Sequence, residues 1–194
     1  MPYKFKFYIG DNIKFQSNVE SMRCEAMSKD DQRCKNKVCI GSPYCWVHLL
    51  HLKHLRIKES NLADAGKGLF AVDPSKPDNA VIFKKNDLIV DYGGEIISGV
   101  ELVDRYGEYT APYGVILNQN RNTYEDAALK RGAGSLANQN PIENRNNAFL
   151  MANYRANPQK IQVKAEKNIK NNKEIYVDYG DEYDFDDPTR HTTK

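Results

Sequence analysis

The chain has 194 residues and a mass of 22.2 kDa, which corresponds to one ordinary domain or to a domain of about 140 residues with a small attachment. Its residues are 40% hydrophobic, 10% aromatic and 28% charged, so the chain is polar but has enough apolar side chains for a core. Lysine and arginine number 28 against 26 acidic residues, a net charge of +2. This balance excludes coating of nucleic acid as the main task and leaves a local basic patch open.

No apolar run approaches the ~18 residues that a membrane-spanning helix needs. The first residues, Met1-Pro2-Tyr3-Lys4-Phe5, alternate in polarity, unlike the apolar block of a secretion signal. We therefore expect a soluble, intracellular protein with no membrane partner.

The first segment, residues 1–20, predicts a β-hairpin. Apolar Tyr3, Phe5, Phe7 and Ile9 alternate with polar residues, and Gly10-Asp11-Asn12 supplies a turn before a second apolar run that ends at Phe15.

The second segment, residues 21–55, contains all four cysteines of the chain. Cys24, Cys34, Cys45 and His48 offer three thiolates and one imidazole, a tetrahedral donor set that suits structural zinc. Cys39 is a spare thiol that could replace Cys34, although the more ordinary interpretation is a small buried hydrophobe.

A short helix is expected from Tyr44 to about Leu52, with Trp46, Leu49, Leu50 and later Leu55 as its apolar contribution. His51 and His54 continue the helical spacing of His48, and we interpret them as solvated positions rather than as ligands of a second metal. The string Cys-x-Ala, Arg-Cys-Lys-Asn-Lys, Tyr-Cys-Trp-x-His resembles short zinc-binding modules in proteins of large DNA viruses.

The third segment, residues 56–185, predicts a mainly β domain, and residues 186–194 form a tail. Short strand-like runs alternate with connections rich in Gly, Pro, Asn and Asp. The expected strands are Gly68–Val72, Leu88–Tyr92, Val115–Leu117, Lys160–Ala165 and Glu174–Tyr179. In this domain, only Gly99–Tyr106 is predicted as a helix.

Four short islands in this domain carry the functional signal, although each alone is an ordinary turn or strand end. They are Ala65-Gly66-Lys67-Gly68-Leu69-Phe70-Ala71, Tyr92-Gly93-Gly94-Glu95, the Asn-rich stretch from Asp126-Ala127 through Asn138-Gln139-Asn140 to Asn146-Asn147-Ala148, and Glu174-Ile175-Tyr176-Val177-Asp178-Tyr179-Gly180. The Gly-Lys-Gly string is neither a phosphate loop nor a dinucleotide fingerprint, because the rest of those motifs is missing.

In this order and spacing, the islands resemble the four motifs of SET-domain protein lysine methyltransferases. The resemblance implies a SET-domain (β-clip) fold of small curved antiparallel sheets around a pseudoknot, and S-adenosylmethionine as the cofactor. It also implies a catalytic role for Tyr179. The cofactor residues that it implies are Lys67, Gly68, Leu69, Tyr92, Asn138, Gln139 and, from the closing tail, Tyr183. The substrate residues that we expect are Tyr113, Val115, Leu117, Tyr176 and Val177.

The sequence departs from the family pattern in the third motif and after the fourth. Gln139 stands where the family usually has histidine, and Ser135-Leu136 replaces Arg-Phe. No cysteine follows Tyr179, so the zinc-binding segment that follows the domain in many members is absent. We expect the tail from Asp181 to Phe185 to close the pocket instead.

The chemistry of methyl transfer agrees with such a site. Transfer from a sulfonium to an amine is an in-line displacement that needs alignment, dry surroundings and a neutral amine, but no metal. A free lysine has a pKa of ~10.4, so burial must favour its neutral form. Tyr179 would orient the amine, and an extended peptide would pair beside the strand at Tyr113–Leu117.

Two hypotheses follow. The first is an active lysine methyltransferase whose substrate is a histone tail, working in the nucleus or on chromatin, or else in the cytoplasm, with the zinc module as a brace or docking element. The second is a catalytically weak or inactive SET-like adaptor whose zinc module binds protein or nucleic acid. Gln139 supports the second hypothesis, whereas Tyr179 and Asn138 argue against it. The target lysine, the number of methyl groups and the oligomeric state are left open.

Overall fold

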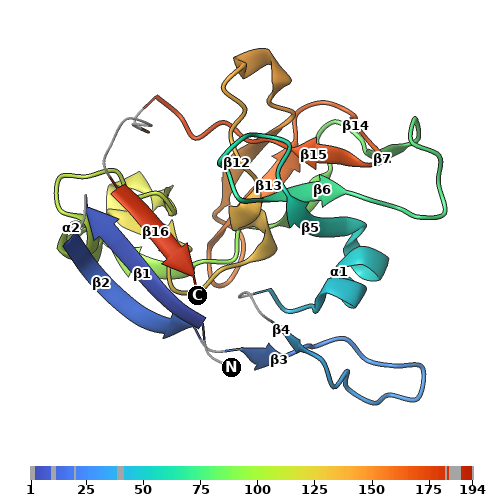
Figure 1. The fold of residues 1–194 in the computed structure, drawn as a ribbon, viewed down its shortest axis with the longest axis horizontal. Coiled ribbons are helices and arrows are strands. Elements are labelled where there is room, and N and C mark those ends of the chain that lie inside the picture. The colour runs from blue at the N-terminus through green and yellow to red at the C-terminus, as the bar shows by residue number, and fades with distance from the viewer. Residues whose placement is uncertain are drawn as a thin grey trace.

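The computed structural model describes residues 3–9, 12–19, 21–38, 42–181, 183 and 189–193, and every structural statement below concerns these residues. The described chain is mainly β, with two α-helices (Figure 1). The strands are β1 (Tyr3–Ile9), β2 (Asn12–Val19), β3 (Met22–Arg23), β4 (Lys37–Val38), β5 (Leu55–Glu59), β6 (Lys67–Ala71), β7 (Val81–Phe83), β8 (Leu88–Asp91), β9 (Glu95–Ser98), β10 (Gly114–Asn118), β11 (Thr123–Asp126), β12 (Ala148–Asn153), β13 (Lys160–Ala165), β14 (Ile169–Lys170), β15 (Lys173–Ile175) and β16 (Thr189–Thr193). The helices are α1 (Trp46–Lys53) and α2 (Gly99–Tyr106), and the 3-10 turns are η1 (Gln119–Arg121), η2 (Ala133–Leu136) and η3 (Glu143–Arg145).

The strands form small antiparallel sheets of two or three strands each. Their orders are β16-β1-β2, β10-β11-β9, β12-β13-β8, β14-β7, β15-β6-β5 and β3-β4. None of them closes into a barrel among the described strands. The predicted mainly β architecture of small antiparallel sheets is confirmed.

Helix α2 has the bounds predicted from the sequence, because both of its ends are specified locally. The Ser98 hydroxyl accepts the backbone N–H of Glu101 at 3.2 Å, and the Glu101 carboxylate accepts the backbone N–H of Ser98 at 2.9 Å. This reciprocal capping box begins the helix. Gly107 ends it with a positive φ of 68°.

Helix α1 begins two residues later than predicted, because Cys45 is extended (φ -67°, ψ 166°) and serves as the N-cap. Leu49, Leu50 and Leu55 are buried as expected, but Trp46 is 71% exposed. The assignment of Trp46 to the apolar contribution of the helix is therefore wrong: it lies in the first turn and faces solvent, whereas the leucines of the later turns are buried.

Strands β1 and β2 pair as an antiparallel hairpin with an irregularity between Phe7 and Tyr8. Gly10 and Asp11 of the expected turn lie outside the described residues. The last strand, β16, pairs with the other edge of β1, so part of the expected tail completes a sheet with the N-terminus. Figure 1 shows this sheet at one end of the molecule, beside α2.

The segment after β15 is threaded between two distant parts of the chain. Tyr176 forms a parallel bridge with Asn138, and Val177 forms one with Ala148. The backbone N–H of Val177 donates to the carbonyl of Asn138 at 2.9 Å, and the carbonyl of Tyr176 accepts from Ala148 at 2.9 Å. Residues 139–147 form the loop that connects these two partners, Asn138 and Ala148, so the segment after β15 passes between the two ends of one loop. This threading corresponds to the pseudoknot that the family resemblance implies.

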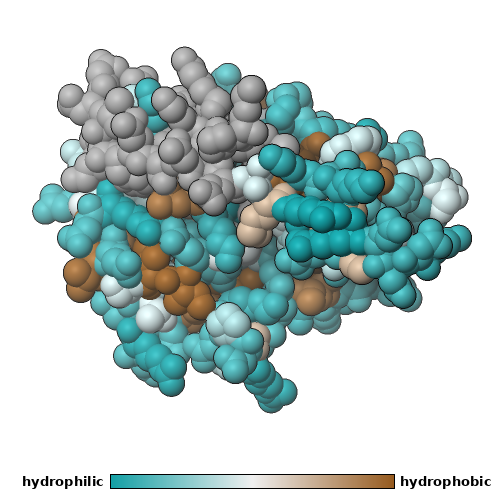
Figure 2. Space-filling view, turned by 90° about the horizontal axis from the view of Figure 1, so that it is seen from below, coloured by the Kyte–Doolittle hydropathy of each residue, from teal (hydrophilic) through white to brown (hydrophobic). Residues whose placement is uncertain are grey.

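The main core lies between the small sheets and receives one residue of helix α1. Leu49 of α1 packs with Leu69, Ile89, Val163 and other buried apolar side chains. This contact fixes helix α1 to the β domain. On the face seen in Figure 2, the described residues are largely hydrophilic, with smaller hydrophobic patches. Among the described residues, no helix is long and apolar enough to cross a membrane.

Candidate active site

Four tyrosines from different parts of the chain meet in one cluster, which we call the tyrosine cluster: Tyr92, Tyr113, Tyr179 and Tyr183. The rings of Tyr179 and Tyr183 have centroids 4.8 Å apart, and the Tyr92 hydroxyl donates to the Tyr113 carbonyl at 3.0 Å. Burial raises the pKa of Tyr92, Tyr113 and Tyr179 above the usual value of 10, and the neighbouring phenols raise it further. The fold thus brings together residues predicted for catalysis, cofactor and substrate.

Tyr179 is held by the third motif at both its backbone and its side chain. Its backbone N–H donates to the side-chain oxygen of Gln139 at 2.7 Å, and its hydroxyl donates to the carbonyl of Ala137 at 3.2 Å. Because burial raises the pKa of the phenol, Tyr179 stays protonated at neutral pH. It can orient a partner by hydrogen bonding but cannot serve as a strong base.

Asn138 connects the first, third and fourth motifs. Its side-chain N–H donates to the carbonyl of Lys67 at 3.0 Å, and its own carbonyl accepts from Val177 at 2.9 Å. Next to this junction, a Cβ added to Gly68 would lie 2.1 Å from Oε1 of Glu174. Only glycine therefore lets the first motif approach the fourth so closely.

Two other predicted cofactor residues, Lys67 and Leu69, differ in the exposure of their side chains. The Lys67 side chain is exposed and forms an ion pair with Glu59, so only its backbone faces the Asn138 junction. Leu69 is completely buried in the main core.

Glu174 is a buried acceptor of several hydrogen bonds beside the first motif. It accepts from the Ser60 hydroxyl at 2.6 Å, from the backbone N–H of Asn61 at 2.7 Å and from the Tyr176 hydroxyl at 2.8 Å. Burial and the bond to Glu174 raise the pKa of Tyr176 to about 12. The Tyr176 hydroxyl is thus directed at Glu174, whereas we predicted a contact with the substrate for Tyr176.

The strand predicted to receive the substrate, β10, is an edge strand. It pairs with β11 on one side, and its other side has no strand partner among the described residues. Leu117 and Val177 are each 1% exposed, whereas Val115 is half-buried and Ile116 is exposed. The side chains of Leu117 and Val177 belong to the cores of the domain, so the backbone edge of β10 is the accessible feature.

The four predicted metal ligands converge. One donor atom each from Cys24, Cys34, Cys45 and His48 lies within 4.8 Å of all the others. Zinc–sulfur bonds of about 2.3 Å in a tetrahedron place sulfur atoms about 3.8 Å apart, so the donor set fits zinc. Cys39 lies outside the described residues.

Two arginines brace this cluster. The guanidinium of Arg23 donates to the carbonyl of Cys34 at 2.9 Å, and that of Arg33 donates to the carbonyl of Cys24 at 2.9 Å. Burial would raise the pKa of the Cys45 thiol, but hydrogen bonds from His48, Asn36 and Cys24 lower it to about 6. A thiolate at Cys45 is the form that binds metal.

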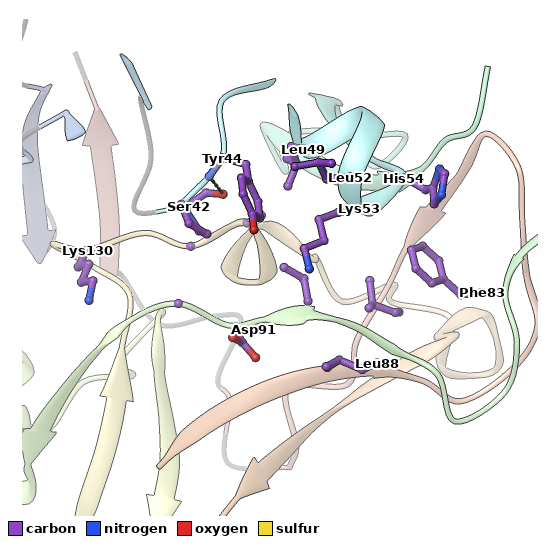
Figure 3. A pocket seen from close by; sticks show the side chains of 16 residues that line it. Ser42, Tyr44, Leu49, Leu52, Lys53, His54, Phe83, Leu88, Asp91 and Lys130 are labelled. Atoms are coloured by element: carbon purple, nitrogen blue, oxygen red, sulfur yellow. Dashed lines mark hydrogen bonds between the residues drawn. The ribbon is translucent and has the colours of Figure 1, made fainter. Parts of the chain in front are cut away.

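A cavity of about 530 Å³ lies between the Cys/His segment and β8 (Figure 3). Tyr44 and Lys53 point into it from one side, and Asp91 and Leu88 lie on the opposite side. None of the residues predicted for cofactor, substrate or catalysis lines it. It is therefore distinct from the site around Tyr179.

Two buried carboxylates near the site, Glu174 and Glu125, are given no role by the sequence. Glu174 belongs to the fourth motif, where an acid within an apolar strand was an available signal. Glu125 accepts hydrogen bonds from the backbone of Gly93 and Gly94 in the second motif. Its only sequence signal is the acidic pair with Asp126 at the end of a short strand-like run.

No protein-family model matches the sequence, and no curated protein matches it. The fold is similar to that of solved chains of polycomb repressive complex 2 (PRC2) from Chaetomium thermophilum. One is the complex in an autoinhibited conformation bound to S-adenosylmethionine, with 25% identity, a TM-score of 0.54, and coverage of 68% of this chain and 16% of that chain. A humanized mutant bound to the inhibitor GSK126 has 25% identity, a TM-score of 0.53, and coverage of 68% and 15%. The complex with H3K27me3 and H3K27M has 25% identity, a TM-score of 0.52, and coverage of 66% and 15%.

The chain thus spans about one sixth of the length of the chains that it matches. The similarity to the SET domain of PRC2 confirms the predicted fold class, a mainly β SET-type fold with a Cys/His cluster near the N-terminus. No match bears on the resemblance of that cluster to viral modules, which stays a prediction.

Proposed function

We propose that this chain is an S-adenosylmethionine-dependent protein lysine methyltransferase that acts on a histone tail. The observation that carries the proposal is the convergence of the first, third and fourth motifs at one junction held by Asn138 and Gln139, with Tyr92 of the second motif in the tyrosine cluster around Tyr179. The similarity to a structure bound to S-adenosylmethionine supports it. We assign the activity to residues 56–185, with residues 1–20 as a hairpin, 21–55 as a zinc module and 186–194 as a tail.

We assign cofactor binding to the backbone of Lys67, Gly68 and Leu69, to Asn138 and Gln139, and to the rings of Tyr92 and Tyr183. S-Adenosylmethionine, when bound, supplies an electrophilic methyl group on a positively charged sulfur. Asn138 suits this role because its side chain already fixes the Lys67 carbonyl at 3.0 Å. Because a Cβ on Gly68 would collide with Glu174, only glycine allows the backbone of the first motif to lie this close to the fourth.

The tyrosine cluster would bind the substrate lysine. Its aromatic rings cover the aliphatic stem, and its burial favours the neutral amine over the ammonium. The Tyr179 hydroxyl donates its proton to the carbonyl of Ala137, so its oxygen accepts an N–H of the amine and leaves the nitrogen lone pair directed toward the methyl group. Because alignment and exclusion of water supply most of the rate in such a displacement, no metal is required in this step.

We propose that the substrate peptide adds to the outer edge of β10, through backbone pairing. Val115 and Tyr113 would contact its side chains, with Leu117, Tyr176 and Val177 forming the supporting wall. Chromatin would be the place of action. One of the similar complexes was solved with H3K27me3 and H3K27M; this supports a histone as the first substrate to test.

The test uses the full chain loaded with zinc. Calorimetric titration with S-adenosylmethionine and its demethylated product measures cofactor binding, and labelled methyl transfer to core histones measures activity. We expect binding together with transfer, and Tyr179→Phe should abolish transfer while the protein remains folded. Absence of binding in folded protein would overturn the enzyme assignment and favour the adaptor. Binding without transfer to histones would overturn the substrate class alone.

A further inference from the structure

Glu125 is a carboxylate buried beneath the turn that follows Tyr92. It lies on β11 and is 3% exposed. None of the ion pairs of the described residues includes it. Backbone N–H groups surround it instead: Oε1 accepts from Gly93 at 3.0 Å and from Gly94 at 2.8 Å, and Oε2 accepts from Ile161. A carboxylate that is buried without a cation needs several such donors.

These bonds complete a ring around the second motif. The backbone N–H of Tyr92 donates to the carbonyl of Ile161 at 2.9 Å, and the N–H of Ile161 donates to Glu125. Glu125 in turn accepts from both glycines that follow Tyr92. Ile161 of β13 is therefore bonded to the turn in two ways. Its carbonyl binds Tyr92 directly, and its N–H is connected to Gly93 and Gly94 through Glu125.

The turn is packed closely against two other segments of backbone. Gly93 has a φ of 85°, and a Cβ on Gly94 would lie 2.7 Å from the carbonyl oxygen of Asp126. A Cβ on Gly93 would lie 2.5 Å from Cα of Gly132. Because the turn is packed against the backbone of Asp126 and Gly132, we expect a change at Glu125 to shift the neighbouring Tyr92.

We infer that Glu125 is a positioning residue for methyl transfer, which it supports by holding the Tyr92 turn so that the Tyr92 ring stays in the tyrosine cluster. This inference rests on the proposed function. Glu125 is not among the residues assigned to substrate or cofactor; it acts through the position of Tyr92, whose hydroxyl donates to the carbonyl of Tyr113. In a site that works by alignment, a displacement of about 1 Å lowers the rate roughly 100-fold.

Glutamine at position 125 tests the carboxylate with little change of shape. Its amide has one oxygen and one NH2 group, so it cannot accept from both Ile161 and the two glycines. We expect Glu125→Gln to lower kcat roughly 10- to 100-fold and to raise the KM for S-adenosylmethionine, because the Tyr92 ring is also assigned to the cofactor. The matched control is Glu108→Gln, because Glu108 is exposed, and its kinetics should equal those of the wild type.

A double-mutant cycle separates positioning from general destabilisation. If Glu125 acts through Tyr92, then Glu125→Gln should cost much less in a Tyr92→Ala background, where the ring is already absent. Independent fold-changes that multiply in the double variant would overturn the inference.

Amide hydrogen exchange gives a readout that does not depend on activity. The N–H groups of Gly93, Gly94 and Ile161 should be protected in the wild type and exchange at least about tenfold faster in Glu125→Gln, while Ile175 in β15 keeps its protection. Unchanged protection of these amides in Glu125→Gln would overturn the inference, whether or not the wild type is active. Absence of methyl transfer by the wild type would count only against the proposed function. If Glu125→Gln does not fold, the wild type alone still tests the inference. Unprotected amides of Gly93 and Gly94 in the wild type would show that Glu125 does not hold the turn.

Discussion

The side-chain oxygen of Gln139 accepts a hydrogen bond from the backbone N–H of Tyr179 at 2.7 Å. Gln139 stands where the resemblance to the family leads one to expect histidine, and this departure was the main argument for an inactive adaptor. The contact gives the glutamine a positive role, since it fixes the backbone of the residue proposed as catalytic. The substitution is therefore compatible with an ordered site.

Replacing Gln139 with alanine removes that acceptor. The N–H of Tyr179 is then left unpaired in a part-buried place, at a cost of about 1–3 kcal/mol, so the melting temperature should fall by several degrees. We expect methyl transfer to fall about tenfold or more, because the Tyr179 backbone is less well held. Calorimetric melting and transfer assays measure the two effects. Gln119→Ala is the control, because Gln119 is exposed; equal effects in both variants would refute the role of the contact.

Replacing Glu174 with glutamine removes a carboxylate that accepts from four donors, those of Ser60, Asn61, Asn138 and Tyr176. A lost hydrogen bond to a buried charged group costs about 1.5–3 kcal/mol, and the backbone of Asn61 beside the first motif should become less ordered. We expect weaker binding of S-adenosylmethionine, measured by titration calorimetry. We also expect the pKa of Tyr176 to fall from about 12 toward 10, measured by NMR of ring-labelled tyrosine. Glu166→Gln, at an exposed position, should change neither quantity.

Loss of a predicted metal ligand should release zinc and lower stability. Cys45→Ser removes one donor of four, and because metal binding supplies folding free energy to such modules, both the zinc content and the melting temperature should fall. Elemental analysis and thermal melting measure this. Cys34→Ser should behave in the same way and Cys39→Ser should retain zinc. The reverse pattern for these last two variants would make Cys39 the ligand, and full zinc in Cys45→Ser would remove the zinc assignment.

The capping box of α2 predicts a dependence of stability on pH. Hydrogen bonds from the backbone and hydroxyl of Ser98 lower the pKa of Glu101 below its usual value of 4.5. The ionised form is therefore favoured by folding, so its contribution is present above pH 4.5 and is lost as the pH falls through the lowered value. Urea denaturation should show Glu101→Gln to be less stable than the wild type at about pH 7, with a smaller difference at about pH 3. A difference that is the same at both pH values would contradict this linkage, and Glu108→Gln should show none.

The sequence predicted those features whose physical cause lies within a few residues. Helix α2 follows from Ser98 and Glu101, which are three positions apart, and β13 has the bounds expected from its apolar run. The Cys/His cluster follows from residue types that have few other uses together. The resemblance in four short motifs was sufficient to indicate the fold class.

Contacts between distant residues were decided only by the tertiary structure. Glu125 meets Ile161 from 36 positions away, and Glu174 meets Asn61 from 113 positions away. Nothing local marks either acid as buried, because a carboxylate is stable inside only where the fold happens to direct backbone N–H groups at it. The exposure of Trp46 and the pairing of β16 with β1 were likewise decided by the tertiary structure. Sequence alone determined which residues were available to the site, whereas the threading of residues 176 and 177 between 138 and 148 decided which of them meet.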